Sequence, residues 1–340
     1  MEKSLKEFKE YYKSKINELL WSQWASLGVS GYGESPAGRP LDPEALLLFT
    51  AKMARYDARL FDEVMDWVNL NSYAVNVQRL KSITRKKKFG GEGPLGAAAD
   101  YLNKKHGIRK LKGISKQKKE SGEKEDLFYF NGEKEINHFG KAEPVFDSHG
   151  YRRGKVELRG NSGNIPLSSE AGLLCRIRYL FGVNARCEII LYLLTHESGH
   201  PSGIAGETYY SQKAVQDTLV EMAKSGIVHI RKDKREKYYY IEQERWKEFL
   251  GIKGKNLEWI NWVLLFSAFE KIWDTISSPK LARQDRKVQS SELRALMAFV
   301  KNDIERSNLS IRISDRRRYL PEEYPKVFMD DIGRILKKGI

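Results

Sequence analysis

The chain of 340 residues contains only two cysteines, Cys175 and Cys187, and no apolar run long enough to cross a membrane. Its most apolar stretch, residues 259–276, is interrupted by charged residues such as Glu270 and Lys271. Both cysteines lie in apolar helical patterns, so we expect buried, unpaired thiols in a reducing compartment. The first 20 residues carry charges throughout and lack the apolar segment of a signal peptide. These absences predict a cytoplasmic protein that does not enter the membrane.

Sequence motifs of common enzyme sites are absent or incomplete. Residues 91–96 match G-x-G-x-x-G, but a lysine-rich run precedes them where a dinucleotide site requires a strand, so they predict a loop. Residues 196–200 match H-E-x-x-H, the zinc-protease pattern, with Gly199 inside the motif and Pro201 after it. Because proline pushes the preceding His200 out of the helical conformation, the two imidazoles cannot share one helix face. We therefore expect no catalytic metal, no cofactor and no enzyme activity.

The chain is rich in positive charge. Lys and Arg number 60 against 45 Asp and Glu, which gives a net charge of +15, and hydrophobic residues make up 41%, enough for packed cores. Such an excess favours polyanions, nucleic acid first and an acidic membrane surface second, although a merely soluble basic protein is the alternative. Residues 81–124 contain 14 basic and 4 acidic residues, among them the run 85–88. Residues 81–124 are therefore predicted to form a mobile basic linker with one helical piece, residues 96–105.

Periodicity and capping predict a helical unit over residues 1–83. Residues 1–25 form an amphipathic pattern, and Asp42 and Pro43 suit the N-cap and first position of the next helix. Ser72 is a candidate cap for the last helix of this unit. That helix has a second interpretation, as a DNA-reading helix that presents Asn76, Gln78 and Arg79.

Small β elements are predicted between this unit and the centre of the chain. Asn131-Gly132 separates two β-prone runs, 127–130 and 133–139, and is a strong hairpin signal because both turn residues need positive φ. A further strand is predicted over 154–159. Residues 84–167 are thus expected to form a basic linker that carries a β-hairpin.

Residues 168–245 carry a series of short helical patterns that ends in a hairpin. Ser211 is placed to cap the longest of these helices, and Gly226 follows its end, where a left-handed residue is favoured. The hairpin strands enclose a basic turn at residues 232–236. The predicted elements are a helix from Ser168 or Ser169 to Phe181, helices over 184–195, 202–209 and 212–225, and strands over 227–231 and 237–241.

The segment SQKAVQDTLVEMAKSGIVHIRKDKREKYYYI resembles the recognition helix and wing of arsenical-repressor-like winged helix-turn-helix regulators, and LFGVNARCEIILYLL is similar to their first core helix. The resemblance covers residues 180–241 and implies DNA binding. In such domains the recognition helix places its first residues on base edges in the major groove. Gln suits adenine, Lys suits guanine, and Ser suits a base or a phosphate. The predicted DNA contacts are Ser211, Gln212, Lys213 and Gln216 on the helix, and Arg231, Lys232, Lys234, Arg235 and Lys237 on the wing.

The last region, residues 246–340, is predicted to be helical. Residues 256–276 are apolar around most of the helix and include three tryptophans, so they must be buried in a core or in a dimer interface. Further helices are predicted over 290–307 and 322–338. We expect this region to serve dimerisation or effector sensing.

Together these patterns predict a mainly α protein with small β elements (α+β), in which a central winged helix-turn-helix is flanked by helical regions. The predicted divisions are 1–83, 84–167, 168–245 and 246–340. The predicted function is a sequence-specific transcriptional regulator that binds double-stranded DNA as a homodimer. One alternative is a winged-helix protein-interaction module, as in a defence or toxin–antitoxin system. Another is an enzyme in which the winged helix is accessory.

Overall fold

The computed structural model describes residues 4–33, 35–114, 124–130, 134–135, 141–252 and 256–339. This part of the chain is mainly helical, with three small two-stranded sheets, which confirms the mainly α prediction. None of its helices combines the length and the apolar character that a membrane crossing needs.

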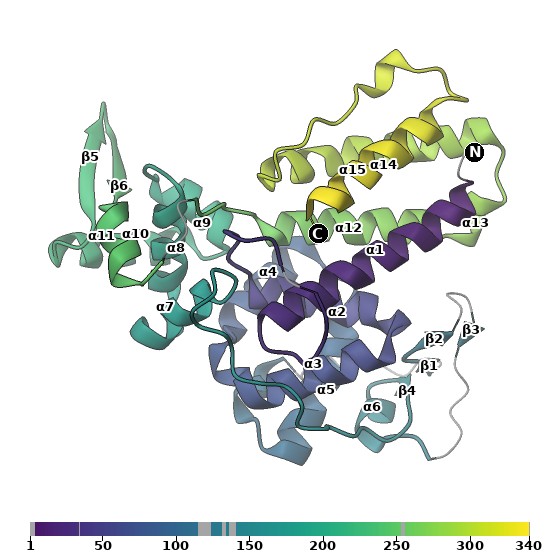
Figure 1. The fold of residues 1–340 in the computed structure, drawn as a ribbon, viewed down its shortest axis with the longest axis horizontal. Helices are drawn as coiled ribbons and strands as arrows, with labels where there is room; N and C mark the ends of the chain where they lie inside the picture. The colour runs from purple at the N-terminus through teal and green to yellow at the C-terminus, as the bar shows by residue number, and fades with distance from the viewer. Residues whose placement is uncertain are drawn as a thin grey trace.

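The described residues bury two separate hydrophobic cores (Figure 1). The small core is built from residues 173–250, and we call residues 173–252 the hairpin unit. The large core draws mainly on residues 8–165 and 260–336, together with Cys175 and Tyr209, and we call these two stretches with their flanking helices the helical body. The hairpin unit contains α7 (Leu173–Phe181), α8 (Ala185–Thr195), α9 (Pro201–Thr208), α10 (Gln212–Lys224), β5 (His229–Asp233), β6 (Glu236–Tyr240) and α11 (Gln243–Phe249).

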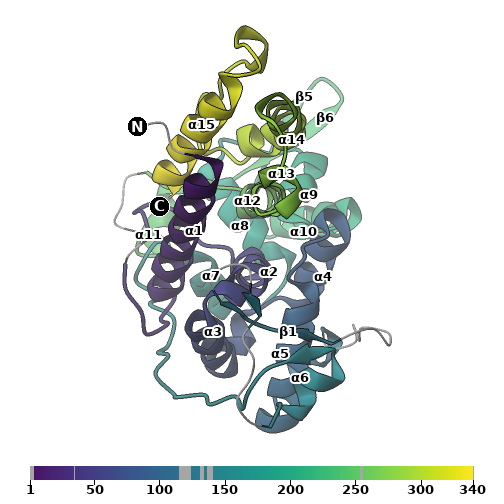
Figure 2. The ribbon, with the colours of Figure 1, turned by 90° about the vertical axis from the view of Figure 1, so that its right-hand side faces the viewer.

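The helical body brings the two ends of the chain side by side, because α15 packs against α1 (Figures 1 and 2). Short 3-10 turns, η1 (Ala54–Tyr56), η2 (Ser72–Ala74), η3 (Arg109–Gly113) and η4 (Arg316–Arg318), connect or follow its helices. The helices are α1 (Leu5–Ser26), α2 (Pro43–Met53), α3 (Ala58–Asn71), α4 (Val77–Lys87), α5 (Glu92–His106), α6 (Pro144–Ser148), α12 (Trp262–Ile276), α13 (Pro279–Ala282), α14 (Arg286–Arg306) and α15 (Tyr324–Gly339).

Capping residues set where the first helices begin. The Asp42 carboxylate accepts hydrogen bonds from the backbone N–H groups of Glu44 and Ala45, and Pro43 occupies the first turn, so the predicted start of α2 is confirmed. The predicted cap at Ser72 is wrong, because Ser72 begins a 3-10 turn and the side chain of Asn76 caps α4.

The helical piece predicted over residues 96–105 of the linker is confirmed and is longer, as α5, but this helix is packed into the helical body and is not part of a mobile linker. Its small residues, Ala97–Ala99, are buried and let α5 approach α2 closely. At Gly91 a Cβ atom would lie 2.2 Å from the carbonyl oxygen of Leu48, so only glycine fits where α5 begins. The G-x-G-x-x-G residues therefore serve helix packing rather than a loop. Linker residues 115–123 lie outside the described residues.

The small strands differ in part from the prediction. β2 (Tyr129–Phe130) pairs antiparallel with β3 (Lys134–Glu135), as a hairpin requires, while the Asn131-Gly132 turn lies outside the described residues. The strand predicted over 154–159 is wrong, since these residues are irregular. Instead β4 (Tyr151–Arg152) pairs in parallel with β1 (Glu125–Asp126).

Helix α12 lies inside the helical body, and Figure 2 shows it end-on among α1, α2 and α14. Its Phe266 ring stacks on Phe49 of α2, with centroids 4.8 Å apart, and its Trp273 stacks on Tyr12 of α1 at 6.2 Å. The core interpretation of this apolar helix is thus confirmed. Because the chain itself covers these rings, α12 is not a dimer interface.

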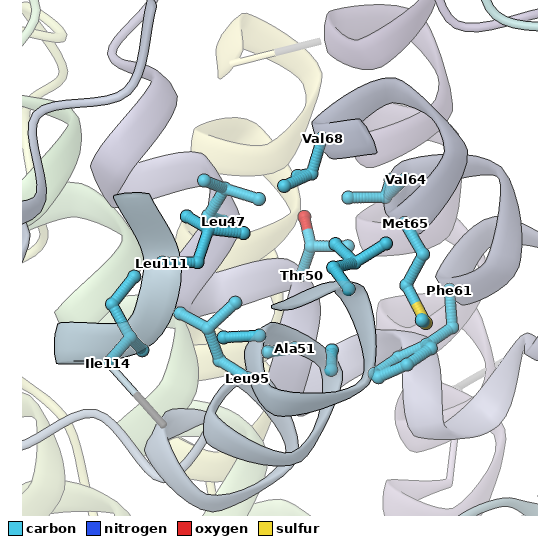
Figure 3. A pocket seen from close by; sticks show the side chains of 13 residues that line it. Leu47, Thr50, Ala51, Phe61, Val64, Met65, Val68, Leu95, Leu111 and Ile114 are labelled. Carbon is cyan, nitrogen blue, oxygen red and sulfur yellow. The ribbon is translucent and has the colours of Figure 1, made fainter. Parts of the chain in front are cut away.

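A small apolar cavity remains between α2, α3 and α5 (Figure 3). Its volume is about 30 Å³, and the Thr50 hydroxyl, its one polar side-chain group, accepts a hydrogen bond from the Trp24 indole. Engineered apolar cavities that hold benzene are about 150 Å³. This cavity is too small for such a ligand, so we assign it to imperfect packing rather than to effector binding.

Candidate nucleic-acid interface

The three helices α8, α9 and α10 pack through short apolar faces that converge on the small core. Ile189 and Leu193 of α8, Ile204 of α9 and Val215 and Leu219 of α10 are fully buried there. On α10 the i, i+4 spacing leaves the opposite side exposed, whereas α8 is buried on nearly its whole circumference. The predicted order of helix, short helix, helix and hairpin is therefore present.

A backbone bridge fastens the hairpin to the segment between α8 and α9. Gly199 and Tyr239 exchange two N–H···O hydrogen bonds of 2.9 Å, so Gly199 acts as a short third strand beside β6. A Cβ atom at Gly199 would lie 2.7 Å from Ile204 and 2.8 Å from Tyr192. Only glycine fits here without displacing these side chains. Its two backbone bonds hold the hairpin next to the helices.

The H-E-x-x-H residues form this junction rather than one helical face. His196 ends α8 in an extended conformation, and His200 is the extended N-cap of α9, as its position before Pro201 predicts. The His196 ring stacks on Tyr192, with centroids 3.8 Å apart, and its Nδ1 lies 2.9 Å from the Tyr192 carbonyl oxygen. Among the residues that the structure describes, no three His, Cys, Asp or Glu side chains are grouped as metal ligands.

Both cysteines are buried and unpaired, as predicted. Burial raises the pKa of Cys175 to about 12 and that of Cys187 to about 12. Neither thiol is therefore ionised near neutral pH, which leaves both as apolar core groups.

The first turn of α10 presents three of the four predicted helix contacts. Ser211 caps the helix by accepting a hydrogen bond of 3.2 Å from the Ala214 N–H, and Ser211, Gln212 and Lys213 are all exposed. Gln216 differs, because it is half-buried and its amide donates to the Tyr239 hydroxyl at 3.2 Å. In this structure Gln216 joins α10 to the hairpin.

The hairpin turn is tighter than predicted. Asp233 pairs with Glu236, so the turn consists of Lys234 and Arg235 alone, and Lys234 adopts the left-handed conformation with φ of 53°. The predicted five-residue turn is therefore wrong, and the strands extend further toward the tip.

Because successive side chains of a strand point to opposite faces, the charged residues of the hairpin are divided between its two faces. Lys232 and Lys237 are direct cross-strand partners on the face of Tyr239, which contacts α10, whereas Asp233 and Glu236 share the opposite face. Like charges placed directly opposite each other are destabilising. An anion bound against the lysine pair would relieve this repulsion on the side of α10.

Arg231 has protein partners of its own. One guanidinium nitrogen lies 3.3 Å from the Ser198 hydroxyl, and another lies 3.6 Å from the exposed Glu197 carboxylate. Seven of the nine predicted DNA-contact residues are thus exposed and make none of the contacts described for Gln216 and Arg231. They lie on one turn of α10 and along the hairpin. They are Ser211, Gln212, Lys213, Lys232, Lys234, Arg235 and Lys237.

The middle of the outer face of α10 carries two carboxylates, and the exposed Lys224 follows only in the last turn. Asp217 and Glu221 are exposed one and two turns beyond Lys213, and Glu221 pairs with Arg186 at 3.2 Å. These carboxylates repel a polyanion. The surface suited to an anion is therefore confined to the first turn of α10 and the hairpin.

The sequence did not reveal how the helical body holds the hairpin unit. The Arg178 guanidinium of α7, fully buried, bonds Glu44 of α2 at 2.7 and 2.8 Å and also pairs with Glu188 of α8. Although burial alone would lower it, the two carboxylates raise the pKa of Arg178 well above its ordinary value. The only hint in the sequence was the presence of these charges inside otherwise apolar helical faces.

A second buried arginine, Arg79 of α4, binds Asp42 at 2.6 Å and Glu44 at 2.7 Å. Asn76 is buried as well, so the interpretation of α4 as a second DNA-reading helix is wrong for these two residues, while Gln78 is exposed. Asn76 and Arg79 contact the segment between α9 and α10 instead.

No protein-family model matches this chain, and neither a curated protein nor a solved structure matches it.

Proposed function

We propose that residues 180–241 form a winged helix-turn-helix and that the protein is a sequence-specific, DNA-binding transcriptional regulator. The order of elements agrees with that motif: helix, bridging segment at Gly199, short helix, second helix and hairpin. The observation that carries the proposal is the face shared by the exposed first turn of α10 and the Lys232–Lys237 pair.

In this proposal the start of α10 enters the major groove. Gln212 would pair with adenine and Lys213 with guanine, each contact being worth about 1–3 kcal/mol of base discrimination. Lys232, Lys237 and the hairpin tip would neutralise the adjoining phosphates. Regulators of this kind usually bind as dimers to two half-sites, so we propose a homodimer on a pseudo-palindromic site that acts without a metal or cofactor.

The test uses the two faces of the hairpin. Duplexes are first selected from a random pool with the full chain, and binding is then titrated against salt. The variant Lys232→Gln/Lys237→Gln should bind the selected duplex more weakly, with a salt slope shallower by about 0.9 for each phosphate that is no longer neutralised. The matched control, Asp233→Asn/Glu236→Gln, changes the opposite face and should not weaken binding.

Two results would contradict the proposal. One is a pool from which no sequence is enriched at low salt. The other is an equal change in duplex binding for both hairpin variants, which would mean that the lysine pair acts only through the overall charge of the protein.

A protein-interaction module is the second candidate, and one observation favours it. Val220, Ile227 and Ile230 are 36%, 43% and 45% exposed on α10 and the hairpin. Apolar residues of this kind suit a protein partner better than a phosphate backbone. Failure of the duplex selection together with loss of a co-purifying protein in Ile230→Ser would support this candidate.

A further inference from the structure

Helix α4 contacts three consecutive residues before α10: Thr208, the last residue of α9, and Tyr209 and Tyr210 of the turn. The Asn76 amide donates to the Tyr210 hydroxyl at 2.6 Å, the Arg79 guanidinium to the Thr208 carbonyl at 2.9 Å, and the Ser82 hydroxyl to the Tyr209 carbonyl at 2.6 Å. Asn76, Arg79 and Ser82 are spaced by three, so they share one face of α4.

This contact holds an uncommon backbone conformation. Tyr209 has a φ of 65°, in the left-handed region that is unfavourable for a bulky residue, and its ring is buried in the large core. Such a residue persists only where its surroundings hold it. The turn before α10 is therefore fixed to the helical body, and α4 cannot shift relative to α10 without breaking these bonds.

The last turn of α4 is basic, and Lys86 faces the turn before α10, whereas Arg85 lies about half a turn round the helix from Asn76. Arg85 follows Ser82 by three residues, or about 4.5 Å along the helix axis. The Lys86 ammonium lies 5.5 Å from the centroid of the Tyr209 ring. Tyr209 is in turn only two residues, at most about 7 Å, from the α10 cap Ser211.

We infer that the last turn of α4 is a further part of the DNA-binding surface, in which Arg85, Lys86 and Lys88 contact backbone phosphates beside the groove that α10 occupies. This inference rests on the proposed DNA-binding function. The major groove is about 12 Å wide, so cations held beside α10 within about that distance would reach the strand that borders the groove.

The four basic residues at this end of α4 differ in their contacts and exposure. Lys87 is paired with Asp303 of α14 at 2.8 Å, which anchors the end of the helix to the body. Arg85, Lys86 and Lys88 are exposed. A helix C-terminus carries about half a negative charge, which would repel a phosphate, but three cations exceed it. The run 85–88 is thus a fixed surface rather than the mobile counter-ion that the linker prediction implied.

The test compares two triple variants of the full chain. In Arg85→Gln/Lys86→Gln/Lys88→Gln the α4 charges are removed, and in Lys104→Gln/Lys105→Gln/Arg109→Gln the same number is removed at the end of α5. On the selected duplex the α4 variant should show a salt slope shallower by about 2 to 3, at about 0.9 per phosphate, while the control keeps the wild-type slope. Thermal unfolding establishes that both variants are folded.

Phosphate-ethylation interference gives a second readout that needs no variant to fold. With the wild-type chain, ethylated phosphates beside the α10 half-site should block binding in addition to those that the hairpin accounts for. The inference is overturned if the α4 variant keeps the wild-type salt slope, or if the wild-type chain shows no interference beyond the phosphates that the hairpin accounts for. If the wild-type chain itself enriches no duplex, the proposed function fails first, and this inference fails with it.

Discussion

The hairpin unit and the helical body are built in different ways. The hairpin unit takes its small core from one continuous stretch, residues 173–250, whereas the body joins residues 8–165 to residues 260–336. Each has an apolar core, yet part of the junction between them is ionic, with Arg79 and Arg178 on one shared carboxylate, Glu44. A junction of directional bonds fixes orientation more narrowly than apolar contact, and the DNA-binding surface that we propose would need its elements held in one orientation.

The strongest way to break this arrangement is to remove Arg178. Arg178→Ala leaves Glu44 and Glu188 facing each other without their shared partner, so we expect a loss of about 3–5 kcal/mol in the free energy of unfolding. Urea unfolding of the full chain measures it. Arg186→Ala removes an exposed ion pair and should cost at most about 1 kcal/mol. Similar losses for both variants would show that the buried junction has no special role.

The helical body contains a buried carboxyl group whose titration should change the free energy of unfolding. Burial raises the pKa of Glu270, on α12, from 4.5 to about 7, even though the Gly90 N–H donates to its carboxylate. Because the folded-state pKa is the higher one, the folded state is favoured below pH 4.5 and loses this stability as the pH rises to about 7. Glu270→Gln should therefore be more stable than wild type at pH 8, by up to about 3 kcal/mol, and nearly equal to it at pH 4.

The control for this pH effect is Glu10→Gln, on the exposed side of α1. It should leave the pH dependence of unfolding unchanged. If Glu270→Gln also left it unchanged between pH 4 and pH 8, the carboxyl would not be the group that titrates.

The smallest expected effect separates two glutamines within the hairpin unit. Gln216→Ala removes the hydrogen bond to Tyr239 and should cost about 0.5–1.5 kcal/mol of stability. Gln212→Ala, at an exposed position, should leave stability within about 0.5 kcal/mol and reduce the preference for the selected duplex over random DNA. Thermal unfolding and competition binding measure the two. A loss of stability in Gln212→Ala alone would reverse these assignments.

The helices of the hairpin unit were predictable from sequence because their signals are local. Ser211 caps α10, and Gly226 follows its end with a φ of 79°, both as predicted. The length of the hairpin turn could not be predicted, because Lys234-Arg235 is not one of the usual glycine- or asparagine-containing turns. The helical piece of α5 was predicted, but its packing was not, because glycines and flanking lysines surround its run of buried alanines.

The exposed residues of the candidate site could be predicted, but their surroundings could not. A capped helix and a basic hairpin can be predicted from a few neighbouring residues. The contact between Arg79 and Thr208 spans 129 positions and leaves no periodic pattern in either segment. Long-range polar contacts of this kind depend on the tertiary structure, which is why the sequence places α4 in a separate unit.

The split of the large core has a consequence for synthesis on the ribosome. Its first part ends at Ile165 and its second begins at Ile260, so the body must wait for the later helices to emerge, at about 5–20 residues per second. The hairpin unit lies between the two, and all of its core residues have been made by then. It is therefore the part best placed to fold first, while α2 and α4 still expose apolar surface that α12 later covers. That interval of several seconds is when the nascent chain is most exposed to aggregation and most in need of chaperones.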